Sequence, residues 1–175
     1  MVQPEVVWQE LVRAEHDAAW ARFYRCFHWR REYERGKGAA ILEPILSVTW
    51  SIAHAFGPQR EELETDLNVK MHRALRRCTK PDLRLLVLDW QHTCYWFWPQ
   101  RFADPTVREA WKVPVLPDSD YYIFLAEDFG FGLFGHPWEK TLCVFGQELL
   151  TVLDQGRPQL LAKRERVRQD GKPIF

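Results

Sequence analysis

The sequence predicts an α+β fold, with an antiparallel sheet of about five to six strands and two to three helices packed on one face. Three observations support this class. Some segments repeat their apolar residues at helical spacing, others alternate or run apolar over strand lengths, and short turns join most of the strand-like segments directly. Strands joined by short turns pair antiparallel, and an antiparallel sheet can carry its helices on one side.

Helical periodicity marks three segments. From Ala14 to Phe27 the apolar residues recur at helical spacing, with acidic residues near the start, where the helix dipole favours them. Residues 60–79 (REELETDLNVKMHRALRRCT) place their apolar side chains on one face, with acids early and bases late. The third segment, Gln147–Leu153, is followed by Gly156 and Pro158, which are typical helix stop signals.

Several further segments have the composition of strands. Ile45–Ile52 alternates large apolar residues with serine and threonine, which is the period of a half-buried strand. Residues 99–117, rich in proline and charge, predict a loop that carries Trp111. The other expected strands are Leu83–Trp90, Thr93–Trp98, Asp120–Ala126, Phe131–Phe134 and Thr141–Phe145.

Length and composition predict one domain. A chain of 175 residues is long enough to bury a core without disulfides or metal. We expect residues 1–162 to form a single α+β domain and residues 163–175 to be a basic, flexible C-terminal tail. The charged, glycine-containing segment 28–40 (HWRREYERGKGAA) predicts an exposed loop or a ragged helix end.

Charge and cysteine usage indicate a cytoplasmic protein without a nucleic-acid or membrane partner. Twenty-four Lys and Arg residues balance twenty-four Asp and Glu residues, so no net field attracts an anionic polymer or bilayer. The four cysteines are widely spaced in apolar contexts and are expected to be reduced and buried. Neither a signal peptide nor a segment long enough to cross a bilayer is expected.

The densest group of titratable residues is Glu127, Asp128, His136 and Glu139, in the stretch EDFGFGLFGHPWEKTLCVFG (residues 127–146). They flank predicted strand ends, so we expect them at one rim of the sheet, where they could bind a metal or act as acid and base. In the structural alternative, the glycines and proline build tight turns whose amides the acids cap. The structural interpretation is favoured, because no complete catalytic motif is present.

A second group contains Asp89, His92 and Cys94, within six positions of one another. This order could serve thiol catalysis, with His92 activating Cys94. Cys94, however, begins an apolar run and is expected to point into the core. A hairpin in which Asp89 bonds turn amides and His92 is partly exposed is therefore favoured, with Asp89 and His92 kept as binding candidates.

Nine tryptophans are the unusual feature of the composition. Both faces of the predicted strand TCYWFW (residues 93–98) are aromatic, so either helices, a ligand or a partner protein must cover them. We expect Trp111, in its polar loop, to be the most exposed anchor. The aromatic binding candidates are Trp96, Trp98, Trp111 and Trp138.

Three long segments resemble a known bacterial family, the domain of unknown function 2716. They are AWARFYRCF (19–27), DWQHTCYWFWP (89–99) and WKVPVLPDSDYYIFLAEDFGFGLFGHPWEKTLCVFG (111–146), and GHPWE (135–139) is the most specific element. The resemblance covers the chain from about Trp8 to Leu153. It implies a small, stand-alone cytosolic protein of one compact domain, and it implies no reaction. In style the chain is also similar to small α+β immunity proteins that neutralise bacterial toxins, an analogy that favours a binding role.

Three hypotheses follow for function. The first is a non-enzymatic, immunity-like or regulatory protein that binds a protein partner through an aromatic and acidic sheet rim. The second is a small hydrolase or metal-assisted enzyme that uses the Glu127, Asp128, His136 and Glu139 rim. The third is a small-molecule sensor with a pocket lined by Trp96, Trp98 and Trp138. P-loop, GxSxG and HExxH patterns are absent from the sequence, so neither a cofactor nor a metal is expected from motifs.

Overall fold

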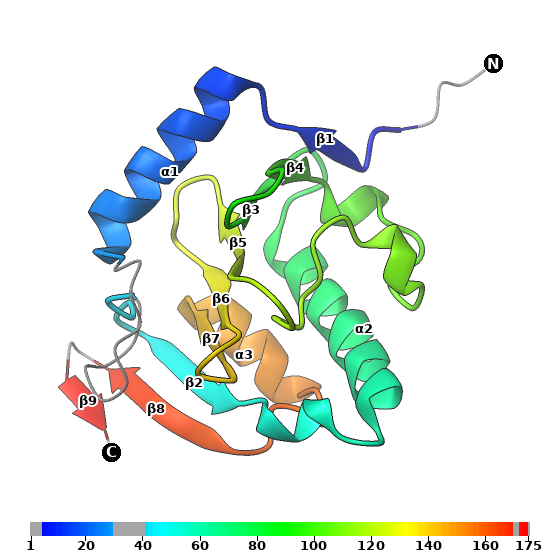
Figure 1. Ribbon diagram of the computed structural model, residues 1–175, viewed down its shortest axis with the longest axis vertical. Helices are drawn as coiled ribbons and strands as arrows, with labels where there is room; N and C mark the ends of the chain where they lie inside the picture. The colour runs from blue at the N-terminus through cyan, green and yellow to red at the C-terminus, as the bar shows by residue number, and fades with distance from the viewer. Residues whose placement is uncertain (1–4, 30–40, 170–171, 175) are drawn as a thin grey trace.

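A nine-stranded antiparallel sheet forms the centre of the protein in the computed structural model, which describes residues 5–29, 41–169 and 172–174 (Figure 1). Its strand order is β1-β4-β3-β5-β6-β7-β2-β8-β9. The α+β class is confirmed, but the sheet is wider than the expected five to six strands. The extra strands lie at the two edges and are β1 (Trp8–Glu10), β8 (Arg164–Gln169) and β9 (Lys172–Ile174).

Every strand expected from the pattern is present: β7 has the expected bounds, β6 starts one residue later and ends two residues later than expected, and the others are shorter. The hairpin of β3 and β4 and the three-stranded meander of β5, β6 and β7 supply the middle of the sheet. In register, β3 pairs Leu86 with Leu125 of β5, and β5 pairs Tyr122 with Gly135 of β6. The bounds are β2 Ser47–Ser51, β3 Leu85–Asp89, β4 Tyr95–Phe97, β5 Tyr122–Ala126, β6 Gly132–His136 and β7 Thr141–Phe145.

Helices cover both faces of the sheet, so the expectation that they pack on one face is wrong. Helices α2 (Arg60–Cys78) and α3 (Gln147–Gln155) lie against one face, and α1 (Arg13–Phe27) lies on the opposite side (Figure 1). The physical reason is the apolar runs YIFLA and TLCVF, in which every residue is buried. A strand that is apolar on both faces needs cover on both faces.

Alternation along the central strands divides the buried side chains into two cores. Val87, Phe124 and Val144 pack toward α2 and α3, whereas their neighbours pack toward Trp20 and Phe23 of α1. The neighbours that face α1 are Leu86, Leu88, Ile123, Leu125, Cys143 and Phe145.

Part of the expected flexible tail is a strand. Residues 164–169 form β8, which pairs with β2 through a register shift between Thr49 and Trp50. Arg166 donates two hydrogen bonds to Glu139 at 2.8 and 2.9 Å and one to Glu43 at 2.9 Å. The sequence alone suggests a solvated tail here, because the acidic partners of these basic residues lie far away along the chain.

The connecting segments and the cysteines can be compared with expectation in turn. The loop at 99–117 is confirmed and contains two short 3-10 helices, Pro99–Arg101 and Arg108–Ala110; a third, Ala53–Phe56, follows β2. Cys94 and Cys143 are buried as expected, but Cys26 is exposed on α1. The segment expected to be a loop at 28–40 lies outside the described residues beyond Trp29. Among the described helices, none has the length and apolar character needed to span a bilayer.

Replacing Arg166 with Met should lower the free energy of unfolding by roughly 3 kcal/mol, because Glu43 and Glu139 would keep their charge in a poorly hydrated site without a partner. Urea denaturation followed by tryptophan fluorescence measures the change. Lys163→Met is the matched control: that side chain is 72% exposed and its ion pair with Glu165 should be worth less than about 1 kcal/mol. Equal stability of the two variants would show that Arg166 does not hold β8.

Candidate functional site

Two acidic and aromatic segments of the chain meet at one end of the sheet. Asp89 ends β3, and Asp120 stands two residues before β5, whose Tyr122 pairs with Asp89. The turn after β6 reaches the same end, because Tyr122 also pairs with Gly135. We call this end the acidic–aromatic rim and define it by Asp89, Trp90, His92, Asp120, Tyr121 and Trp138.

The acidic part of the rim is an imidazole between two carboxylates. His92 Nδ1 lies 3.0 Å from Asp89 Oδ1 and 3.5 Å from Asp120 Oδ2. The His92 side chain is 63% exposed, whereas the side chains of Asp89 and Asp120 are only 13% and 10% exposed. Across residues 5–29, 41–169 and 172–174, no Lys or Arg forms an ion pair with either carboxylate.

Burial controls the proton affinity of these groups. It raises the pKa of Asp89 to about 6, and the charge of Asp120 adds to that rise while the bond from His92 opposes it. Burial likewise raises the pKa of Asp120, and the hydrogen bond to Asp89 raises the pKa of His92. All three groups therefore hold their protons more tightly than they would in water, and such clusters of shifted pKa values are common at functional sites.

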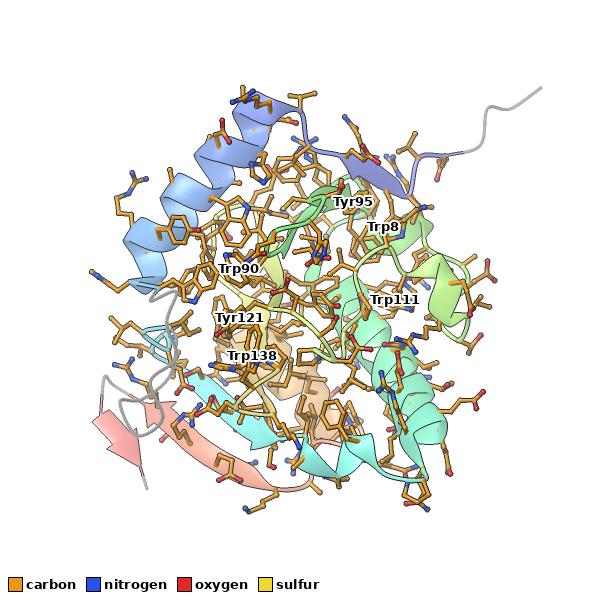
Figure 2. All side chains as sticks on the ribbon, in the orientation of Figure 1. Trp8, Trp90, Tyr95, Trp111, Tyr121 and Trp138 are labelled. Atoms are coloured by element: carbon orange, nitrogen blue, oxygen red, sulfur yellow. The ribbon has the colours of Figure 1, made fainter. Side chains whose placement is uncertain are left out.

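The aromatic part of the rim adjoins the acids through the chain itself, since Tyr121 follows Asp120. The Tyr121 ring is buried and lies 4.9 Å from the ring of Trp138 and 5.7 Å from that of Trp90. Trp90, Tyr121 and Trp138 follow one another along this side of the molecule (Figure 2). Trp138 is 56% exposed, so its ring is supported from beneath by Tyr121 and open to solvent above.

The structure does not bring Glu127, Asp128, His136 and Glu139 together. Glu127 and Asp128 lie in the turn between β5 and β6, at the opposite end of β6 from His136. A strand of this length separates its ends by about 13 Å. Consecutive turns of an antiparallel meander always lie at opposite ends of the sheet, and that constraint divides the group.

Glu127 and Asp128 have structural partners at their end. Glu127 accepts a hydrogen bond from Arg84 at 2.8 Å, and Asp128 Oδ1 accepts one from the Gly130 amide at 2.8 Å. The contact of Asp128 with the Gly130 amide is a turn cap, as expected if these acids serve the turns and not catalysis.

His136 and Glu139 belong to the network of Arg166. His136 Nδ1 accepts the Glu139 backbone N–H at 3.1 Å, so the ring is neutral and carries its proton on Nε2. Burial lowers the pKa of His136 to about 4. Burial alone would raise the pKa of Glu139, but hydrogen bonds from Arg166 and Thr141 lower it below its ordinary value. These contacts stabilise the turn of GHPWE and leave Trp138 as its exposed side chain.

The other binding candidates are separated from the rim. The ring centroids of Trp96 and Trp98 lie 3.7 and 5.7 Å from the guanidinium carbon of Arg84. Arg84 forms an ion pair with Glu127, at the other end of the sheet from the rim. Trp111, expected to be the exposed anchor, is 5% exposed and packs in the core, where its Nε1 donates to the Pro105 carbonyl. A proline-bounded loop can still bury its aromatic residue when it folds back over a helix.

Cys94 is buried as expected, with its Sγ 3.6 Å from the Asp89 carbonyl oxygen. Burial raises the pKa of this thiol, which keeps it protonated. The hairpin interpretation of this segment therefore agrees with its environment, and Asp89 and His92 remain as its polar rim residues.

Sequence reasoning missed Asp120 and Tyr121 as members of the site. Their position in the sequence could have indicated them. The segment DSDYY (118–122) leads into a strand that pairs antiparallel with the strand ending at Asp89. Only the sheet order makes those two strands neighbours.

Residues 130–135 (GFGLFG) match the letters of the dinucleotide-binding pattern G-x-G-x-x-G, but they occupy a hairpin turn and β6 rather than a turn from strand to helix. Close packing explains two of these glycines, because neither position has room for a side chain. A Cβ on Gly132 would lie 2.3 Å from the Phe124 carbonyl oxygen, and one on Gly135 would lie 2.7 Å from Pro117. The match therefore carries no nucleotide site.

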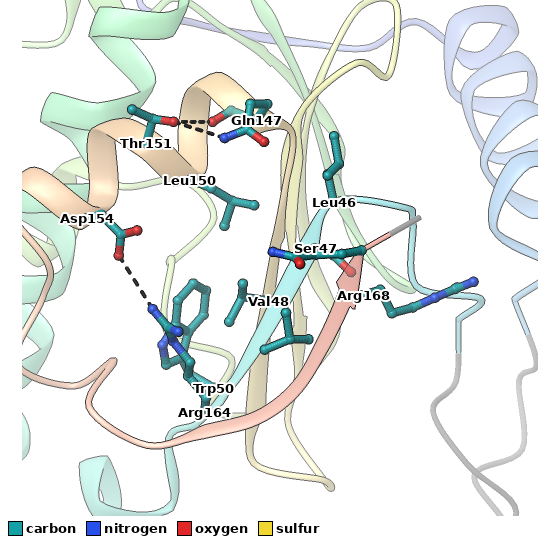
Figure 3. A pocket seen from close by; sticks show the side chains of 12 residues that line it. Leu46, Ser47, Val48, Trp50, Gln147, Leu150, Thr151, Asp154, Arg164 and Arg168 are labelled. Carbon is teal, nitrogen blue, oxygen red and sulfur yellow. Dashed lines mark hydrogen bonds and ion pairs between the residues drawn. The ribbon is translucent and has the colours of Figure 1, made fainter. Parts of the chain in front are cut away.

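A small pocket of about 170 Å³ lies between α3, β2 and β8 (Figure 3). Val48, Trp50 and Leu150 contribute apolar walls, and Asp154 pairs with Arg164 at 3.7 Å at one end. None of the site residues expected from the sequence lines it. The candidate site residues that the structure brings together lie at the rim and not in this pocket.

Acid should destabilise the protein through His136. Because its pKa is about 4 when folded and near 6.5 when unfolded, the unfolded chain binds more protons between these values, and stability falls as the pH falls. Between pH 7 and pH 5 the loss from this group is on the order of 2 kcal/mol. Urea midpoints at the two pH values measure it.

His136→Asn retains a neutral acceptor for the Glu139 amide and should show a smaller fall. His54→Asn, at an exposed histidine, should fall as the wild type does. A fall of the same size in His136→Asn and the wild type would contradict the assignment.

Comparisons with known proteins agree with the resemblance. A family model described as "Protein of unknown function (DUF2716)" matches residues 10–150. The chain is 28% identical over 162 residues to the uncharacterized protein YxiI of Bacillus subtilis (strain 168), an alignment that covers 90% of this chain and 98% of that protein. No solved structure matches. Since the family model spans α1, α2, the central strands and the whole acidic–aromatic rim, the chain belongs to the DUF2716 family.

Proposed function

We propose that this chain is a non-enzymatic bacterial binding protein of the cytoplasm, immunity-like or regulatory, which holds a protein partner at the acidic–aromatic rim. One observation carries the proposal: Trp138 is 56% exposed while its ring rests on buried Tyr121, at the same end of the sheet as Asp89 and Asp120. An exposed tryptophan on a rigid support loses little freedom on binding, and tryptophan is enriched among residues that dominate interface energies.

The surroundings of Trp138 support a protein partner. Pro137 and the bond from the Glu139 amide to His136 fix the turn that carries the ring. His92, whose side chain is 63% exposed, and the less exposed carboxylates of Asp89 and Asp120 give this end of the sheet polar groups beside its apolar ones. Rigid aromatic contact with a polar border is the usual anatomy of a protein interface.

The two alternatives receive less support from the geometry. A hydrolase built from Glu127, Asp128, His136 and Glu139 needs them within about 3 Å of one another or of a shared metal. They are divided between two ends of the sheet. A sensor pocket of Trp96, Trp98 and Trp138 meets the same difficulty, because Arg84 holds the first two at the Glu127 end.

Trp138→Ser should abolish retention of the partner. Wild-type protein and the variant are immobilised and exposed to extract of the source bacterium, and the proteins retained are quantified by mass spectrometry. We expect one protein whose recovery falls at least tenfold with the variant, the loss typical of a dominant interface residue. The purified partner should then bind the variant at least tenfold more weakly in calorimetry.

Leu83→Ser is the matched control, since Leu83 is 50% exposed but lies two residues before β3, at the opposite end of that strand from Asp89. It should retain the partner as the wild type does. Recovery of no protein that depends on Trp138, or equal loss in both variants, would rule out the rim as the binding surface.

A further inference from the structure

We propose that Asp89, His92 and Asp120 bind a zinc ion through Asp89 Oδ1, His92 Nδ1 and Asp120 Oδ2. The inference does not depend on the proposed partner binding, because it concerns the inner, polar part of the rim and not Trp138. The motifs of the sequence predict no metal, so the observations that support this site are structural.

The spacing of the three atoms fits tetrahedral zinc. Ligands at about 2.1 Å from a tetrahedral ion lie about 3.4 Å from one another. His92 Nδ1 lies 3.0 Å from Asp89 Oδ1 and 3.5 Å from Asp120 Oδ2, and one ligand atom from each of the three residues falls within 4.8 Å of the others. Both distances from His92 Nδ1 are thus within about 0.4 Å of the tetrahedral spacing, and the three side chains are close enough to share one ion.

The donor set selects the kind of metal. One imidazole nitrogen with two carboxylate oxygens suits zinc and its neighbours, whereas calcium and magnesium prefer oxygen ligands alone. The His92 side chain is 63% exposed, so the solvent side of the site is open to water as the fourth ligand.

The charge of the site supplies an independent argument. The structure contains a second pair of poorly exposed carboxylates, Glu43 and Glu139, with side chains 7% and 17% exposed, and Arg166 bridges them. Asp89 and Asp120 are buried to a similar degree, yet no Lys or Arg of the described residues pairs with them. Two adjacent buried carboxylates need positive charge, and a dication supplies it in the space where His92 already points.

Rigid backbone holds two of the ligands in place. Asp89 and Asp120 flank the paired strands β3 and β5, and the Trp90 amide donates to the Tyr121 carbonyl at 3.2 Å. His92 is tied to the same strand end by its amide, which donates to the Asp89 carbonyl at 3.3 Å. The ligand atoms are thus brought together before any ion arrives, which lowers the cost of binding.

Calorimetric titration with Zn²⁺ tests the site, together with Co²⁺ titration followed by visible absorption. The protein is used without a histidine tag and in a Cys26→Ser background, which removes the exposed thiol as a competing ligand. We expect one saturable site per chain and the absorption of four-coordinate cobalt. His92→Gln and Asp120→Asn should each weaken zinc binding by at least 10- to 100-fold, since loss of even an outer partner of a metal site costs that much.

His16→Gln is the matched control. His16 Nδ1 lies 3.1 Å from Asp17 Oδ1 on exposed α1, a pair with two ligand groups in place of three, and its loss should leave zinc affinity unchanged. Circular dichroism and urea midpoints show whether each variant folds. Zinc affinity that is equal in the wild type and in folded His92→Gln, or that falls as much in His16→Gln, would overturn the proposal.

Trp138→Ser separates this inference from the proposed function. The variant should bind zinc with wild-type affinity while losing the protein partner. Weaker zinc binding by folded Trp138→Ser would contradict the zinc site as defined here, whereas retention of the partner by this variant would contradict only the proposed function.

Discussion

Burial of β5, β6 and β7 on both faces is the constraint on which the other elements depend. All fifteen positions of these three five-residue strands are buried, so each face needs an apolar cover. α2 and α3 supply it on one side, and α1, with Trp20 and Phe23, supplies it on the other. Two-sided burial also limits the polar groups of the central sheet to strand ends and turns, because a charge in the middle of these strands would lose its hydration.

The meander then distributes those polar groups between two ends. The β5–β6 turn carries Glu127 and Asp128 to one end, where Arg84 and a turn amide bind them. The β6–β7 turn carries Trp138 to the other end, which also holds Asp89 and Asp120. An aromatic ring and an acidic pair therefore share one surface because of strand order, although more than forty positions of sequence separate Asp89 from Trp138.

Two pairs of poorly exposed carboxylates illustrate two ways of managing buried charge. Arg166 bridges Glu43 and Glu139 with a fixed guanidinium, and this joins β8 to the turn after β6. Asp89 and Asp120 have a histidine whose own charge depends on pH. The first arrangement is closed and stabilises the fold. The second is open to solvent on the His92 side, and it is the place where we propose that zinc binds.

Local pattern by itself determined the three helices, the inner strands, the loop at 99–117 and the α+β class, because helical and strand periodicity arise from neighbouring residues. It also singled out Asp89, His92 and Trp138, whose residue types are costly or unusual in their segments. Only the tertiary structure decided that Asp120 faces Asp89, that Trp111 is buried, that Arg166 belongs to a strand, and that Glu127 and His136 lie apart. Strand order and register are contacts between distant residues, and no local periodicity records which strands become neighbours.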